Sequence, residues 1–80
     1  MTPAQARAAR AVLKIGVREV AAAVSVTPNT ISRIEADTPA GPRGPNASTI
    51  AVVQSWYESQ GIEFIPQNGG GPGVRLKARS

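Results

Sequence analysis

The stretch that decides the fold is VAAAVSVTPNTISRIE, which runs from Val20 to Glu35. It predicts two short helices separated by a tight turn at Ser25. The second helix opens with Thr27, whose hydroxyl can satisfy an unpaired backbone N–H at a helix start. Pro28 follows, and proline is favoured at the first helical position because its missing N–H costs nothing there. We therefore expect a helix, a turn and a second helix in this stretch.

The second helix of the pair carries short polar side chains outward, while Ile31 and Ile34 point inward. Short polar side chains and one arginine on the first turns of a helix suit the reading of base edges in the major groove. Arg33 fits a guanine edge and Asn29 fits an adenine edge. The pattern predicts a DNA-binding helix-turn-helix, whose candidate contacts on this helix are Thr27, Pro28, Asn29, Thr30, Ser32 and Arg33.

Two further arginines are candidate contacts outside that helix. Arg18 stands at the start of the first helix of the pair, where we expect it near phosphates, which fix the register without reading sequence. Arg43 lies in a loop rich in proline and glycine, from Asp37 to Pro45. It either contacts phosphate, enters the minor groove or stays solvated.

The composition favours a small helical protein with an acidic partner. The 80-residue chain has room for one domain, and its core is too small for a deep enzyme cleft. The net charge of +4 favours nucleic acid or an anionic surface as partner. The chain has no cysteine and no histidine. This excludes zinc fingers and catalysis by a cysteine or histidine nucleophile. We expect no enzyme, no metal site and no cofactor.

No run approaches the ~18 apolar residues that a membrane span needs. Arginines and a lysine interrupt the N-terminal segment, so it lacks the apolar region of a signal peptide. We expect a cytoplasmic protein without a membrane partner.

The flanking segments predict two more helices. Thr2-Pro3-Ala4-Gln5 is a capping box that opens a helix to about Lys14, and Gly16 is expected to break it. The pair of helices then covers residues 17–24 and about 28–36. A further helix runs from the cap Asn46 to about Gln60, before a terminating glycine.

The remainder of the chain reads as a short β tail. Residues 62–65 and 74–77 alternate like strands around a loop rich in glycine and proline. Because a lone hairpin is marginal in water, it should pack on the helices or on the same element of a second subunit. We expect the tail to carry assembly, so that residues 1–61 fold without it. The candidate dimer contacts, in the last helix and the tail, are Trp56, Tyr57, Ile62, Phe64, Val74 and Leu76.

Arg10 and Glu35 are a candidate structural ion pair. Glu35 closes its helix near the negative end of the helix dipole, where a carboxylate is disfavoured. A cation from the N-terminal helix would compensate for this. We expect Arg10 to supply that charge and to join the first helix to the third through a partly buried contact.

Residues 6–60 resemble the Cro/repressor-like (XRE) helix-turn-helix family. The shared pattern is present as Val20-Ala21, Ser25-Val26-Thr27 and Thr30-Ile31, and it ends with Arg33-Ile34-Glu35. The tail also resembles one that follows the helical domain in many short bacterial members. Two departures are Val17, where the family often has glutamine, and Ser25, where it often has glycine.

The resemblance implies a mainly α fold: a compact repressor-like domain of four to five helices at residues 1–61, with a short β-hairpin or strand tail at residues 62–80. It also implies a transcriptional regulator, usually a repressor, that binds an inverted-repeat operator in double-stranded DNA as a homodimer. An alternative stays open. The chain would then be an antitoxin or antiactivator whose tail binds a partner protein.

Overall fold

The structure, a computed structural model, describes residues 1–36, 46–66 and 73–77. Over these ranges the chain forms four helices followed by a two-stranded antiparallel sheet. The mainly helical fold with a C-terminal hairpin is thereby confirmed, with four helices in the described residues. The elements are α1 Pro3–Leu13, α2 Val17–Ala23, α3 Pro28–Ile34, α4 Ala47–Ser59, β1 Ile62–Ile65 and β2 Gly73–Leu76.

The helix starts follow the local sequence. Thr2 Oγ1 accepts the backbone N–H of Gln5 at 3.1 Å, and Gln5 Oε1 accepts that of Thr2 at 2.8 Å, which confirms the predicted capping box. Thr27 caps α3 through a single bond, because its hydroxyl accepts the backbone N–H of Thr30, and proline follows directly after it. Asn46 Oδ1 accepts the N–H of Thr49 at 2.7 Å and starts α4.

The end of α1 differs from the expectation. The helix stops at Leu13 because Lys14 adopts the left-handed conformation, with φ 57° and ψ 42°. Gly16 has φ −89° and instead precedes α2, where its N–H donates to the Glu19 carboxylate at 3.2 Å. The prediction that Gly16 breaks the helix is therefore wrong, since a lysine supplies the left-handed residue that terminates it.

The hairpin follows a glycine with a positive φ, a conformation that other residues rarely adopt. Gly61 has φ 95° and carries the chain out of α4 into β1. The two strands pair from Ile62 with Leu76 to Ile65 with Gly73, so β2 begins one residue earlier than predicted. The N–H of Lys77 extends the ladder by donating to the Gly61 carbonyl at 2.7 Å.

The core forms where the helices and the hairpin meet. Tyr57 and Ile62 are both 0% exposed, so these two predicted dimer contacts lie inside the protomer. Trp56, Phe64 and Val74 pack partly buried against the same core. The buried apolar residues of the core are Ala6, Ala9, Val20, Ala21, Ile31, Ile34, Val53, Tyr57 and Ile62.

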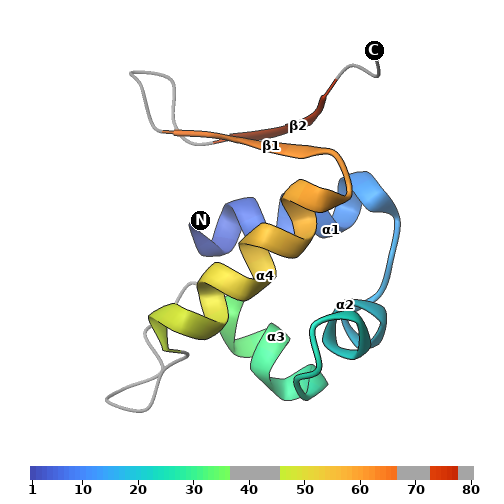
Figure 1. The fold of residues 1–80 in the computed structure, drawn as a ribbon, viewed down its shortest axis with the longest axis vertical. Helices are drawn as coiled ribbons and strands as arrows, with labels where there is room; N and C mark the ends of the chain where they lie inside the picture. The colour runs from blue at the N-terminus through green and yellow to red at the C-terminus, as the bar shows by residue number, and fades with distance from the viewer. Residues whose placement is uncertain (37–45, 67–72, 78–80) are drawn as a thin grey trace.

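The hairpin and the α2–α3 pair lie at opposite ends of the longest axis of the molecule (Figure 1). β1 packs against α4, and β2 packs against α1. The buried side chain of Gln5 holds the open end of the ladder, because its Nε2 donates to the carbonyls of Ile65 at 2.9 Å and Gly73 at 3.1 Å. The hairpin is thus tied to the first turn of α1.

The Tyr57 hydroxyl is buried and has no hydrogen-bond partner among the described residues. Burial raises the pKa of this phenol to about 12, and the nearby Glu35 carboxylate adds to the effect. We expect Tyr57→Phe to lower the free energy of unfolding by less than about 0.5 kcal/mol, or to raise it, because the variant no longer buries an unpaired hydroxyl. Urea unfolding followed by far-UV circular dichroism measures this change. A loss of more than about 1 kcal/mol, the net value of a typical hydrogen bond, would show that the hydroxyl has a partner.

Candidate nucleic-acid interface

The turn between α2 and α3 depends on one left-handed residue. Ser25 has φ 59°, which confirms that serine occupies the turn position where glycine is expected. The next residue, Val26, donates its N–H to the carbonyl of Ala21 at 2.9 Å and so closes the end of α2. The turn folds α3 back so that it packs against α2.

Ser25→Gly is expected to stabilise the protein by about 0.5 kcal/mol. A left-handed residue with a Cβ costs roughly 1–2 kcal/mol, and the greater freedom of glycine in the unfolded chain takes back roughly 0.5–1 kcal/mol. Thermal unfolding of the two proteins side by side measures the difference. Gly61→Ala, at φ 95°, is the control in the opposite direction and should destabilise the fold. A destabilised Ser25→Gly variant would contradict a strained turn.

The two faces of α3 are divided as the sequence predicts. Ile31 and Ile34 are buried, whereas Thr27, Pro28, Asn29 and Ser32 are exposed. Thr30 and Arg33 are half-buried. The exposed side of α3 is therefore polar.

The two threonines at the start of α3 are engaged with each other. The hydroxyl of Thr27 accepts the N–H of Thr30 at 3.3 Å and lies 3.0 Å from the Thr30 hydroxyl. Their polar groups therefore also stabilise the helix start. Arg18 is exposed in the first turn of α2, and Arg43 lies outside the described residues.

The predicted ion pair between α1 and α3 is confirmed. The guanidinium of Arg10 contacts the Glu35 carboxylate with two hydrogen bonds, Nε to Oε2 and Nη2 to Oε1, both at 2.9 Å. Glu35 is 8% exposed and the Arg10 side chain 28%. The hydrogen bond to Glu35 raises the pKa of Arg10 above its ordinary value. This two-bonded geometry fixes the end of α3 against α1.

Arg7 makes a contact that sequence reasoning missed. Its Nη1 donates to the backbone carbonyl of Glu35, so two arginines of α1 hold the C-terminal end of α3. Arg7 and Arg10 are three residues apart, which places them on one face of a helix. This spacing could have predicted that Arg7 contacts the same helix end as Arg10.

The hairpin leaves part of one strand uncovered. Leu76 is 54% exposed, and the neighbouring Arg75 pairs across the hairpin with Glu63 at 2.7 Å. The hydrogen bond from Lys77 to Gly61 marks a hydrogen-bonded pair, and bonded and non-bonded pairs alternate along an antiparallel ladder. The backbone N–H and C=O groups of Val74 and Leu76 therefore point away from β1, toward the outer edge of β2.

Over residues 1–36, 46–66 and 73–77, no helix combines the length and apolar character of a membrane span. The same residues include no group of three or more side chains suited to holding a metal ion. Neither a scan of protein families nor a search of curated proteins finds a match to this chain. The functional assignment rests on the site itself.

Proposed function

We propose that this chain is a repressor-like helix-turn-helix regulator that binds duplex DNA in the cytoplasm, with α3 in the major groove. The supporting observation is the α2–turn–α3 unit: two short helices joined by a tight turn, with a buried apolar face on α3 and a polar outer face. This is the arrangement that DNA-binding helix-turn-helix proteins use to present a recognition helix. Asn29 and Arg33 are the proposed base contacts, because their side chains match adenine and guanine edges.

The charge distribution supports the same proposal. The chain carries a net charge of +4, and two of its carboxylates, Glu35 and Glu63, are neutralised by arginines within the fold. Arg18 is exposed on the helix that packs against α3, where a phosphate contact fixes the register. Each pair cancels one positive and one negative charge, so the net charge of +4 remains to attract the DNA backbone.

We propose that β2 supplies the dimer contact, through its outward backbone groups and the exposed Leu76. A two-fold axis along the longest axis of the molecule, beside the hairpin, places both α3 helices at the same end. Binding to successive major grooves on one side of the duplex requires the two α3 helices of such a dimer to lie ~34 Å apart.

Selection from a random duplex library, followed by a nuclease footprint on the enriched sequence, tests this function. We expect an inverted repeat whose half-sites lie roughly one helical turn apart. Failure to enrich any sequence over the starting library would overturn sequence-specific binding. Enrichment of a single half-site would overturn the dimer while leaving α3 as the reader.

A second candidate function uses the same edge of β2. An antitoxin or antiactivator would add a strand of its partner protein to this edge, with DNA binding secondary. The exposed Leu76 beside unpaired backbone groups favours such a contact. Sedimentation of the purified chain distinguishes the two: a homodimer at micromolar concentration occupies the edge, whereas a monomer leaves it to another protein.

A further inference from the structure

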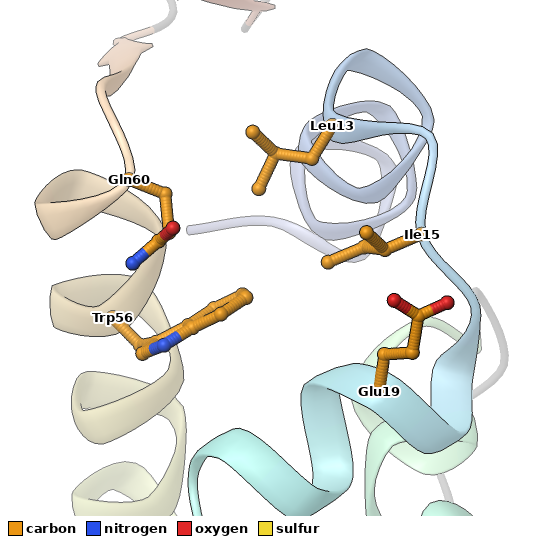
Figure 2. A pocket seen from close by; sticks show the side chains of 5 residues that line it. All are labelled: Leu13, Ile15, Glu19, Trp56 and Gln60. Atoms are coloured by element: carbon orange, nitrogen blue, oxygen red, sulfur yellow. The ribbon is translucent and has the colours of Figure 1, made fainter.

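A half-open hollow of about 280 Å³ lies away from the outer face of α3, between α2, α4 and the end of α1. Figure 2 shows Trp56 and Gln60 reaching into it from α4, opposite Leu13 and Ile15 at the α1–α2 junction. Glu19 enters it from the first turn of α2. The hollow thus combines an apolar wall, an aromatic ring and two polar side chains.

Glu19 brings into this hollow a carboxylate that belongs to the first turn of α2 and pairs with no basic side chain among the described residues. Its carboxylate accepts the N–H of Gly16 at 3.2 Å, and it makes no ion pair with any of the described residues. Glu35 and Glu63, by contrast, each pair with an arginine. Glu19 is exposed, and its carboxylate lines the same hollow as the Trp56 ring.

Gln60 adds an acceptor on the opposite side. Its Nε2 donates to the Ser59 hydroxyl at 3.3 Å, and its amide oxygen is turned toward the hollow (Figure 2). Acceptors on two sides and an indole ring are the groups that recognise an ammonium ion, which donates hydrogen bonds and is attracted to the face of tryptophan.

We propose that this hollow binds a small organic cation, a primary ammonium group on a short apolar chain. The ammonium group lies between the Glu19 carboxylate and the Trp56 ring, and the apolar chain lies along Leu13 and Ile15. A neutral apolar ligand would desolvate Glu19 without compensation, and an anion would be repelled by it. The volume lies just below the ~300 Å³ at which pockets for drug-sized ligands begin, which fits a smaller molecule.

The chain contains one tryptophan, so its fluorescence reports directly on the hollow. We would titrate the full chain with n-hexylammonium, 1-hexanol and hexanoate, which share the apolar chain and differ in charge. We expect saturable binding of hexylammonium, about tenfold or more tighter than hexanol, equivalent to about 1.4 kcal/mol. Hexanoate should give no saturable change.

Glu19→Gln is the matched variant, because it keeps an oxygen for the Gly16 N–H while removing the charge. It should bind hexylammonium no more tightly than hexanol. Glu58→Gln, which removes an exposed carboxylate of α4 that does not line the hollow, is the control and should bind as the unchanged protein does. Equal binding of hexylammonium and hexanol by the unchanged protein would overturn the proposal, as would a Glu19→Gln variant that keeps the preference. The comparison of ligands needs no variant, so it stands even if a substitution disturbs the fold.

Discussion

Removal of residues 62–80 is expected to unfold the protein rather than leave an independent bundle of helices. The truncation deletes Ile62, a fully buried residue of the core, together with the partly buried Phe64 and Val74. It also removes both carbonyls that accept hydrogen bonds from the buried amide of Gln5. Unpaired buried groups of this kind cost about 1–3 kcal/mol each.

The single substitution Ile62→Ala tests how much one buried side chain of the tail contributes to stability. Deleting a buried isoleucine side chain costs about 2–5 kcal/mol, whereas the whole stability of an 80-residue domain is roughly 4–12 kcal/mol at 0.05–0.15 kcal/mol per residue. Urea unfolding should show a much lower midpoint for this variant, and Leu76→Ala, at an exposed position of the hairpin, should change it far less. A chain truncated after Gly61 that kept native helical dichroism and unfolded cooperatively would show that the helices fold alone.

Glu35→Gln is expected to destabilise the protein by about 2–3 kcal/mol. Breaking a fully buried ion pair costs about 3–5 kcal/mol because the remaining charge is left unpaired. Arg10 is 28% exposed and stays partly hydrated, which places the loss below that range. The double variant Arg10→Met, Glu35→Leu should recover most of the loss, since apolar side chains of similar volume often replace a buried pair without cost.

Glu63→Gln is the matched control for Glu35→Gln. It breaks the other arginine–glutamate pair, between Glu63 and Arg75, which lies on the exposed hairpin. Exposed pairs contribute little because water screens them, so the midpoint of urea unfolding should barely move. Equal losses in the two glutamine variants would contradict a locking role for Arg10 and Glu35.

The elements that the sequence predicted are those determined locally. Thr2, Thr27 and Asn46 each cap a helix through a hydrogen bond to a residue three positions away, so the bond can be read from the chain. A cationic partner for Glu35 was also predictable, because a carboxylate is disfavoured at the C-terminal end of a helix.

The features that were missed depend on tertiary packing. The amide of Gln5 reaches Ile65, sixty positions along the chain, and nothing in the local pattern indicates that contact. On sequence alone the tail was expected to be dispensable for folding, but the burial of Ile62 leads to the opposite expectation. The hollow around Trp56 arises from α1, α2 and α4 together, so no single segment predicts it.

The central claim is that α3 reads DNA sequence while other contacts only position it. Arg33→Ala and Asn29→Ala should each weaken binding to the selected duplex by about 1–3 kcal/mol and relax discrimination at one base pair in each half-site. Arg18→Ala should instead weaken binding to all duplexes alike. It should also reduce the slope of log affinity against log salt concentration by about the value of one phosphate contact.

Fluorescence anisotropy titrations on the selected duplex, on single-mismatch duplexes and on a random duplex test this claim most directly. Ser48→Ala, in the first turn of α4, is the control for an exposed polar side chain elsewhere and should bind as the unchanged protein does. We predict that Arg33→Ala loses affinity for the selected duplex while binding the random duplex nearly as before. An equal loss on both duplexes would contradict the assignment of α3 as the reading helix.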